Sequence, residues 1–278
     1  MLRYIFARNK HLTTSAFPPL SLAAISSTIS NPALERLDEI LIMPTVSSTS
    51  DMLWQRFAEG KTTPAVCLAE TQTAGRGRRG DRWHSPESGN LYLSLFWQHT
   101  AEKPRHGLSI AIGISLINTL KQAGISRLQL KWPNDVLFNR QKLAGILVES
   151  RFNTKQNIVV GIGLNFKLPQ STQHQIQQPT TSLEQLCDTL PCRNWLAGKI
   201  IQNMIETIEL FEHRGLSDFL PLWPQYDALH GQHITLLSDN ERLSALACGI
   251  NEHGELRYMR DNQLHLLSNS HVSIRFAS

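Results

Sequence analysis

The chain has 278 residues, 41% of them hydrophobic, which is enough to bury a large core in one or two domains. Its net charge of +4 comes largely from Arg3, Arg8 and Lys10, which precede the first acidic residue, Glu35. Without these three, the 27 Lys and Arg fall to 24 against 23 acidic residues, so the composition does not support a broad nucleic-acid-binding face.

Four cysteines are scattered along the chain without a CxxC pair or a metal-ligand spacing. This usage predicts a reduced, cytosol-like compartment and no structural zinc. No apolar run reaches the roughly 18 residues of a membrane-spanning helix, because the most apolar stretch, residues 108–120, is interrupted by polar residues. We therefore expect a soluble protein that does not act at a membrane.

The N-terminal stretch has a composition of its own. Residues 1–30 are rich in Ser and Thr, contain arginines and lack Asp and Glu, as mitochondrial transit peptides do. A disordered tail, or a start codon placed too early, fits equally well. We expect residues 1–36 to form a disordered extension or a targeting segment. The location that we favour is cytoplasmic, with a mitochondrial one as the alternative if residues 1–30 are a transit peptide.

From about Leu34 onward, strand and helix patterns are mixed rather than regularly alternating, which favours an α+β fold. Residues 64–70 have the pattern of a buried strand, and residues 90–97 place Leu91, Leu93, Leu95 and Trp97 on one face of another. The Gly/Arg segment 75–80 lies between them. We expect a loop pinned between two strands.

The middle of the chain continues with a helix, a strand and a turn. Residues 108–123 form a mostly apolar helix that Gly124 ends at its C′ position, and residues 127–131 alternate like a strand. A tight turn over residues 132–135 is expected next, because Pro133 fixes φ and Asn and Asp favour turns.

Three further strands are expected at residues 136–138, 143–149 and 158–165, the first two joined by a polar link over residues 139–142. The third contains Gly161 and Gly163, and glycines within a strand usually indicate close approach of another group to the backbone.

The rest of the chain divides into a loop, a helix and a group of short strands. Residues 170–182 lack periodicity and predict a mobile loop, whereas residues 195–213 form an amphipathic helix. Beyond Leu229, short alternating runs predict a small antiparallel barrel, with strands at residues 234–237, 243–250, 256–259, 264–267 and 272–276.

The segment Gly75-Arg76-Gly77-Arg78-Arg79-Gly80, called the glycine-rich loop below, has the residues of an anion site. Glycines let the backbone bring N–H groups against a ligand, and arginines offer planar donors, so phosphate is the natural ligand. A flexible basic loop or an RNA-contacting patch would have the same composition.

Two other segments carry polar residues at strand ends. Lys131-Trp132-Pro133-Asn134-Asp135 presents a carboxylate and an amide on a rigid turn, although it is also compatible with a purely structural turn. Lys142 opens the apolar strand Lys142-Leu143-Ala144-Gly145-Ile146-Leu147-Val148-Glu149, where a solvated lysine would be the ordinary interpretation.

Together and in this order, these segments resemble the biotin protein ligase family, and the resemblance covers residues 37–278. The matching residues are Ser47-Ser48-Thr49, Gln72, the glycine-rich loop, Trp83, the KWPND turn, the KLAGILVE strand and the GIGLNF segment that starts at Gly161. The resemblance implies a mixed-sheet catalytic domain with flanking helices over residues 37–229 and an SH3-like barrel over residues 230–278.

Some bacterial members of the family also carry an N-terminal winged helix-turn-helix repressor domain. Such a domain needs roughly 60 residues, whereas about 36 precede the catalytic region here. We therefore expect a form without the repressor domain, which does not bind DNA sequence-specifically.

The resemblance also implies roles for individual residues. It places biotin against Ser48, Thr49, Gln72, Arg76, Lys142 and Gly163. It places ATP or the adenylate against Arg76, Arg78, Trp83, Asn134, Lys142, Asn165 and Arg275. The catalytic residues that it implies are Arg78, Lys142 and Asp135.

These residue types suit a reaction in which the biotin carboxylate attacks the α-phosphate of ATP, because cations must offset the repulsion of two anions. ATP and biotin are the expected substrates, and Mg²⁺ is expected with ATP. Asp135 would orient or deprotonate the acceptor amine, or would help to hold Mg²⁺, and the sequence leaves both open. One departure from the family pattern follows the glycine-rich loop, where Asp81 and then Arg82 stand in place of a basic residue directly after it.

The expected partner is a biotin carboxyl carrier protein domain, such as that of acetyl-CoA carboxylase, which supplies the acceptor lysine. Family members occur as monomers and dimers, so a homodimer is possible. A lipoate protein ligase or octanoyl transferase of the same fold is the alternative enzyme, and a nucleic-acid-binding module using the arginine cluster is a distant third.

Overall fold

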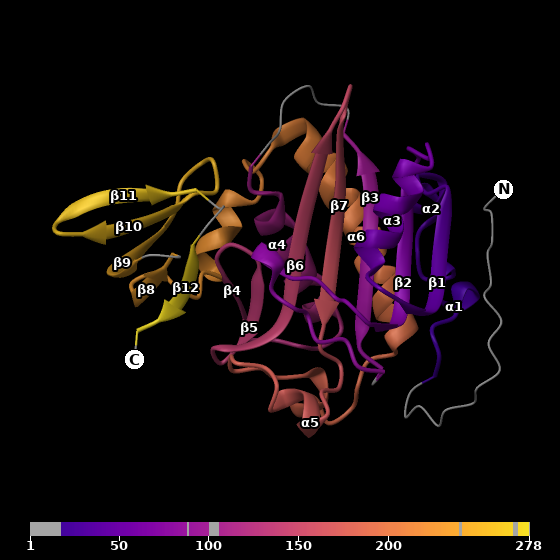
Figure 1. Cartoon of the computed structure of the whole chain (residues 1–278), viewed down its shortest axis with the longest axis horizontal. Coiled ribbons are helices and arrows are strands. Elements are labelled where there is room, and N and C mark those ends of the chain that lie inside the picture. Colours follow the sequence, from indigo (N-terminus) through magenta and orange to yellow (C-terminus); the bar gives the residue numbers. More distant parts are fainter. Residues whose placement is uncertain (1–17, 88, 100–105, 239–240, 269–271, 278) are drawn as a thin grey trace.

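The structure, a computed structural model, describes residues 18–87, 89–99, 106–238, 241–268 and 272–277. It contains a seven-stranded mixed sheet with helices on both faces and, beside it, a five-stranded antiparallel sheet (Figure 1). The α+β class expected from the sequence is therefore confirmed. Among the described residues, no helix is both long enough and apolar enough to cross a membrane.

The large sheet has the strand order β1-β2-β3-β7-β6-β5-β4. Only β1 and β2 run parallel; the other neighbours are antiparallel. The strands are β1 (Glu39–Val46), β2 (Ala65–Gln72), β3 (Leu91–Gln98), β4 (Leu128–Lys131), β5 (Asp135–Phe138), β6 (Gln141–Phe152) and β7 (Gln156–Leu164).

The strands expected from alternation are confirmed, with one shift that concerns the site. The link between β5 and β6 consists of Asn139 and Arg140 alone, both with positive φ (47° and 62°). Because this turn is so short, Lys142 lies inside strand β6 rather than in a polar link, and its backbone is fixed by the sheet.

Helices cover the two faces of the sheet unequally. On one face, α4 (Leu108–Gln122) and α6 (Arg193–Arg214) pack against the sheet around the main core; on the other lies the shorter α3 (Thr49–Ala58). Strand β2 shows the division, because Val66 and Leu68 belong to the main core while Cys67 packs with Leu53 and Trp54 of α3.

The N-terminal segment differs from the expectation. Residues 18–36 are not a disordered extension: they contain α1 (Leu22–Ser26) and α2 (Asn31–Glu35), which pack on α6 and bury Leu20, Ile25, Ile29 and Ala33. Residues 1–17, which carry most of the proposed transit-peptide character, lie outside the described residues.

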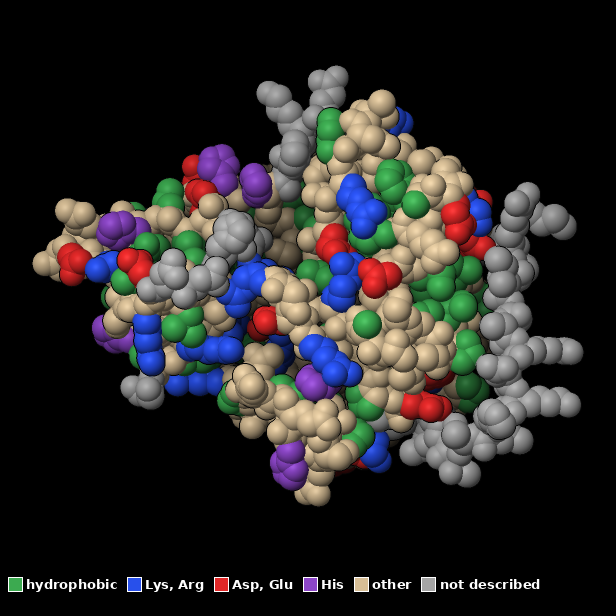
Figure 2. All heavy atoms as spheres, viewed as in Figure 1, with side chains coloured by type: hydrophobic (Ala, Val, Ile, Leu, Met, Phe, Trp, Pro, Cys, Tyr) green, Lys and Arg blue, Asp and Glu red, His purple; other side chains and the backbone are tan. Residues whose placement is uncertain are grey.

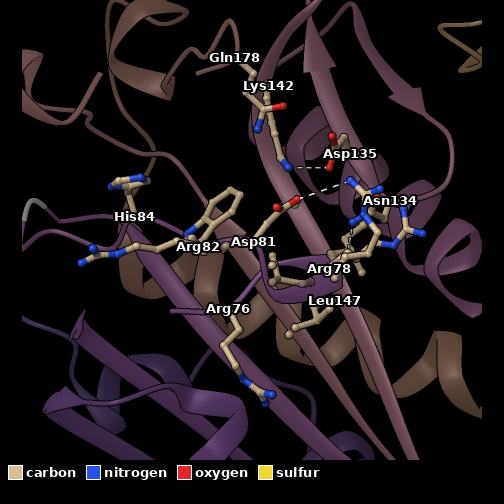
Figure 3. Close-up of a pocket in the computed structure, with 18 of the residues that line it drawn as sticks. Arg76, Arg78, Asp81, Arg82, His84, Asn134, Asp135, Lys142, Leu147 and Gln178 are labelled. Carbon is tan, nitrogen blue, oxygen red and sulfur yellow. Dashed lines mark hydrogen bonds and ion pairs between the residues drawn. The ribbon is translucent and has the colours of Figure 1, made fainter. Parts of the chain in front are cut away.

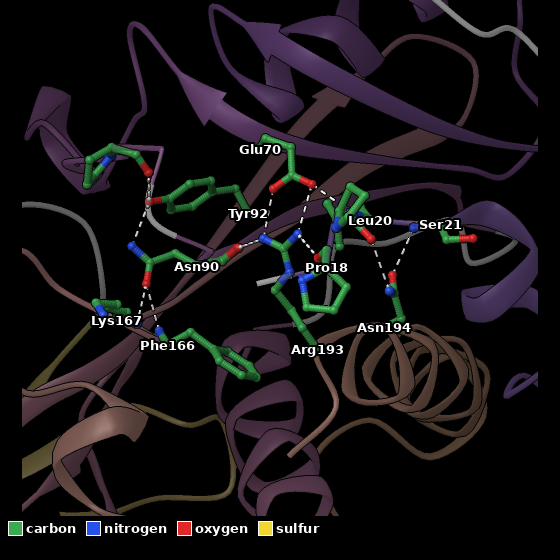
Figure 4. A network of polar contacts seen from close by, with 12 residues as sticks. Pro18, Leu20, Ser21, Glu70, Asn90, Tyr92, Phe166, Lys167, Arg193 and Asn194 are labelled. Atoms are coloured by element: carbon green, nitrogen blue, oxygen red, sulfur yellow. Dashed lines mark hydrogen bonds and ion pairs between the residues drawn. The ribbon is translucent and has the colours of Figure 1, made fainter. Parts of the chain in front are cut away.

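A buried arginine explains why this segment is held. The Arg193 guanidinium donates to both carboxylate oxygens of Glu70 (2.7 and 2.8 Å) and to the Pro18 carbonyl (2.9 Å), and the Leu20 amide donates to Glu70 (2.7 Å) (Figure 4). Asn194 adds bonds to the backbone of residues 19 and 21. Each buried charge is paired, so the chain before β1 is part of the folded unit.

The loop expected over residues 170–182 has more structure than its composition indicated. It contains α5 (Gln170–Gln173), and the short 3₁₀ turn η2 (Leu183–Gln185) follows it. The Lys142 amide donates to the Pro179 carbonyl (2.9 Å), and the Thr181 amide donates to the Lys142 carbonyl (3.0 Å). These bonds fix the end of the loop beside Lys142.

After the 3₁₀ segment η3 (Leu220–Gln225), the chain forms the second sheet, in the order β11-β10-β9-β8-β12. Its strands are β8 (His233–Leu237), β9 (Arg242–Ile250), β10 (Leu256–Arg260), β11 (Gln263–Leu267) and β12 (Ser273–Phe276). This agrees with the small antiparallel barrel expected after Leu229. Trp132 of the KWPND turn is 2% exposed and donates its Nε1–H to the Gly254 carbonyl (2.8 Å), which ties the turn to this sheet.

Candidate active site

A cavity of about 430 Å³ opens on the α3 face of the large sheet and extends to the second sheet. Its position follows from strand β7: Val160, Ile162 and Leu164 face the main core, so Gly161 and Gly163 face the opposite side and line the cavity. Lys and Arg side chains gather in the hollow between the two sheets (Figure 2).

The structure brings together nearly all the residues implied by the family resemblance. The cavity is lined by Ser48, Thr49, Gln72, Arg76, Arg78, Trp83, Asn134, Asp135, Lys142, Gly163 and Arg275. Asn165 is the exception. Its buried amide donates to the carbonyls of Thr181 (3.1 Å) and Lys142 (3.4 Å), so it fixes the backbone behind the cavity. Its contact with a nucleotide stays a prediction.

Hydroxyl groups line one end of the cavity. Ser48 is the N-cap of α3, and the Thr49 amide donates to the Gln72 side-chain oxygen (2.8 Å). The Ser94 hydroxyl lies 2.8 Å from that of Thr49 and 3.0 Å from that of Ser50. This end therefore offers several donors and acceptors to a polar, uncharged head group.

Sequence reasoning missed Ser94 and Ser50. Ser94 lies within a strand that is otherwise apolar, and it pairs across the sheet with Gly161. The signal available in the sequence was a lone serine within this strand. That Ser94 faces Gly161 is visible only in the fold, because it depends on the pairing of β3 with β7.

The floor of the cavity accepts no side chains. A Cβ added at Gly163 would lie 2.3 Å from Cε2 of Trp83, and one at Gly145 would lie 2.9 Å from Cζ3 of the same ring. The Trp83 indole therefore rests directly on the glycines. Its Nε1–H is buried and has no hydrogen-bond partner among the described residues, and the Lys142 ammonium lies 5.2 Å from the ring centroid.

At the other end of the cavity, two lysine ammonium groups surround the carboxylate of Asp135. The Lys142 ammonium lies 2.7 Å from Oδ1 of Asp135 (Figure 3). The Lys131 ammonium lies 3.8 Å from Oδ2. Asp135 is cross-strand partner to both Lys131 and Gly145, so the sheet sets this arrangement. The three side chains are only 12–14% exposed, which strengthens the attraction between them.

Lys131 was noted in the KWPND turn but not assigned to the site. Burial lowers the pKa of its ammonium; the Asp135 carboxylate raises it, and the nearby cations Lys142, Arg275 and Arg78 lower it further. Because the charge of Lys131 interacts with all four of these neighbours, Lys131 belongs to the same charged cluster.

Arg78, from the glycine-rich loop, and Arg275, from β12, also line this end of the cavity. The Arg78 guanidinium lies 3.5 Å from the Asn134 side-chain oxygen, and burial lowers the pKa of Arg78. Asn134 is fixed in turn by donating to the Ile146 carbonyl (2.8 Å). Arg275, on β12, donates to Gln178 (3.4 Å) and so lines the cavity from the second sheet.

The donor set does not fit a resident metal ion. Each oxygen of Asp135 already faces a lysine ammonium, and the described residues contain no group of three His, Cys, Asp or Glu that would hold a metal. A divalent cation prefers several oxygen ligands and is repelled by ammonium groups.

Arg76 points away from the cationic cluster (Figure 3). Its Nη2 lies 2.8 Å from carboxylate oxygens of both Asp51 and Glu149. The family resemblance placed Arg76 against biotin and the adenylate. Its guanidinium pairs with these two carboxylates, and its contact with a ligand stays a prediction.

Comparisons with known proteins agree with this geometry. The Biotin/lipoate A/B protein ligase family matches residues 42–165. The bifunctional ligase/repressor BirA of Salmonella typhimurium is 35% identical over 241 residues, which cover 86% of this chain and 75% of that protein. The biotin–[acetyl-CoA-carboxylase] ligase of Mycobacterium tuberculosis is 31% identical over 170 residues, covering 59% of this chain and 61% of that protein.

Among solved structures, the biotin protein ligase from Aquifex aeolicus in complex with biotin and ATP shares the fold. Its TM-score is 0.73 at 23% identity, and the match covers 86% of this chain and 99% of that one. The combination of a 35% identical ligase and this shared fold leads to one conclusion: the chain belongs to the biotin protein ligase family.

Proposed function

We propose that the chain activates biotin with ATP to form biotinyl-5′-AMP and then transfers the biotinyl group to one lysine of a biotin carboxyl carrier protein. One observation carries the proposal: a single cavity joins a hydroxyl-lined pocket to a cationic cluster across a floor of glycines. Biotin has a matching form, with a polar ring at one end and a carboxylate at the other.

In the first step, a carboxylate oxygen of biotin forms a bond to the α-phosphorus of ATP, and pyrophosphate leaves. Two anions must approach each other, and at about 4 Å their repulsion is roughly 4 kcal/mol in a partly screened site. Lys142 and Arg78, with Arg275 facing them, supply the opposing charge at the cationic end.

In the second step, the neutral amine of the acceptor lysine attacks the acyl carbon, AMP leaves with the electron pair of the broken acyl–oxygen bond, and the proton that the amine loses passes to solvent. Asp135 is held by two ammonium groups, which suits a carboxylate that positions Lys142. We assign it that role in preference to a magnesium ligand. The glycine-rich loop and Trp83 shield the mixed anhydride from water.

The remaining proposals concern the surroundings of the enzyme. Magnesium accompanies ATP, the cytoplasm is the compartment, and acetyl-CoA carboxylase supplies the carrier domain. We expect no sequence-specific DNA binding, and the chain is compatible with either a monomer or a homodimer.

The direct test incubates the full chain with biotin, ATP, Mg²⁺ and a purified biotin carboxyl carrier domain, followed by intact-mass measurement of the carrier. We expect a gain of one biotinyl group that requires ATP and is lost when the acceptor lysine is replaced by arginine. A parallel reaction with lipoate and a lipoyl domain distinguishes the related ligases. Modification of the lipoyl domain with no change in the biotin carrier would overturn the proposal.

A further inference from the structure

Three segments that are far apart in the sequence meet at the Arg76 guanidinium. Arg76 is the second residue of the glycine-rich loop, Asp51 lies in the first turn of α3, and Glu149 lies on β6. One nitrogen, Nη2, lies 2.8 Å from Oδ1 of Asp51 and 2.8 Å from Oε2 of Glu149.

The carboxylate of Glu149 is itself held in place. The indole N–H of Trp54, a residue of α3 that is 3% exposed, lies 3.4 Å from the same Oε2. The backbone of Arg76 is fixed as well, because it pairs with Arg82 across the base of the loop. Both the side chain and the main chain of Arg76 are therefore anchored, and its guanidinium faces away from Lys142 and Asp135 (Figure 3).

Each anchored segment also carries a residue of the proposed site. Helix α3 begins at Thr49, in the hydroxyl pocket; the glycine-rich loop carries Arg78; and β6 carries Lys142. The ionic junction at Arg76 therefore ties the glycine-rich loop, and Arg78 with it, to the two elements that carry Thr49 and Lys142.

We propose that Asp51 and Glu149 are positioning residues that, through Arg76, hold the glycine-rich loop over the biotinyl-5′-AMP intermediate and slow its escape before transfer. This rests on the proposed function. Neither carboxylate has to touch the ligand, because each acts through Arg76.

The junction has little effect on global stability. The side chains of Arg76, Asp51 and Glu149 are 36%, 41% and 24% exposed, and ion pairs at that exposure contribute weakly to the free energy of unfolding. Neutral variants should therefore fold, and their defects can be measured in the reaction itself.

The test uses the full chain with Asp51→Asn and Glu149→Gln, separately and combined. Enzyme-bound biotinyl-5′-AMP is formed from biotin, ATP and Mg²⁺, and its release is followed after dilution into excess unlabelled biotin. We expect release from the double variant to be about fivefold to tenfold faster, since two such pairs together are worth about a factor of ten. The affinity for biotin alone should change less than about twofold, a difference that general loosening of the fold would not produce.

A mutant cycle shows whether the carboxylates act through Arg76. If they do, adding both neutral substitutions to Arg76→Met should accelerate release no further than Arg76→Met does alone. Glu209→Gln is the matched control, because Glu209 also forms a 2.9 Å pair with an exposed arginine, Arg36, and lies on α6.

Three results would overturn the inference: unchanged release from the double variant, equal acceleration by Glu209→Gln, or full additivity with Arg76→Met. Failure of the proposed function looks different, because the unsubstituted chain would then form no biotinyl-5′-AMP at all.

Discussion

Replacement of Lys142 by methionine removes a cation from the centre of the site while keeping much of the volume of its side chain. In the structure the Lys142 ammonium lies 2.7 Å from Asp135 at the cationic end of the cavity, and its side chain is 14% exposed. Lys131 and Arg78 still face Asp135 in the variant, so the carboxylate keeps compensating charge. We therefore expect Lys142→Met to fold.

The expected effect on adenylate formation is large. One unit charge about 4 Å from the reacting anions contributes roughly 4 kcal/mol at an effective dielectric constant of 20, which corresponds to a rate factor of about 1000. Partial screening by solvent and by the neighbouring cations reduces this, and we expect a loss of at least about a hundredfold in the adenylation rate.

The assay is a single-turnover measurement of biotinyl-5′-AMP formation with enzyme in excess over labelled biotin. Lys199→Met is the matched control, because this lysine lies on α6 and contacts Gln202 rather than an acidic residue. The control should react at the unsubstituted rate. An adenylation rate for Lys142→Met within about tenfold of that rate would refute the electrostatic reasoning, since losing a charge at this position must cost more.

Three further predictions follow from packing and burial. Gly163→Ala places a Cβ 2.3 Å from the Trp83 ring, so biotin affinity measured by calorimetry should fall at least about tenfold with no change of fold; unaltered affinity would show that Trp83 can move freely. The pKa of Lys131 is lower in the folded state than the 10.5 of a free lysine, so between these two pKa values the unfolded chain binds more protons than the folded chain. Urea-determined stability should therefore rise more steeply with pH across that window in the unsubstituted chain than in Lys131→Met, and equal slopes would contradict the shift. Burial, with Glu39 as a second cause, raises the pKa of Cys67 to about 12, so iodoacetamide at pH 8 should label the exposed Cys192 and leave Cys67 unmodified in the folded chain.

Much of the fold follows from periodicity in the sequence. The alternation in residues 90–97 identifies β3, because every second residue, from Leu91 to Trp97, faces the main core. The ending of α4 follows equally well from Gly124, whose φ of +86° favours glycine. Strong local patterns of this kind depend little on distant parts of the chain.

Elements whose stability depends on distant residues were not identified. Residues 18–36 are held by Arg193 and by packing on α6, about 170 residues away in the sequence. The edge strand β1 contains Pro44 and lacks a regular alternation, so neither it nor the short α3 was assigned.

For the candidate site, too, the sequence predicts one part and leaves another to the fold. Motifs identify the residues of the site, but they do not show which side chains form ion pairs with one another. The sequence gives no sign that Arg76 pairs with carboxylates 25 and 73 positions away, or that Lys131 and Lys142 share Asp135. Such pairings depend on how strands and helices are arranged, which is decided by the whole core.

The most direct test of the central claim is a crystal structure of the chain with a non-hydrolysable analogue of biotinyl-5′-AMP. The account predicts the ureido ring among the hydroxyls of Ser48, Thr49 and Ser94, and the acyl-phosphate mimic within hydrogen-bond distance of Lys142 and Arg78. An analogue bound in the reverse direction, or outside the glycine-floored cavity, would contradict it.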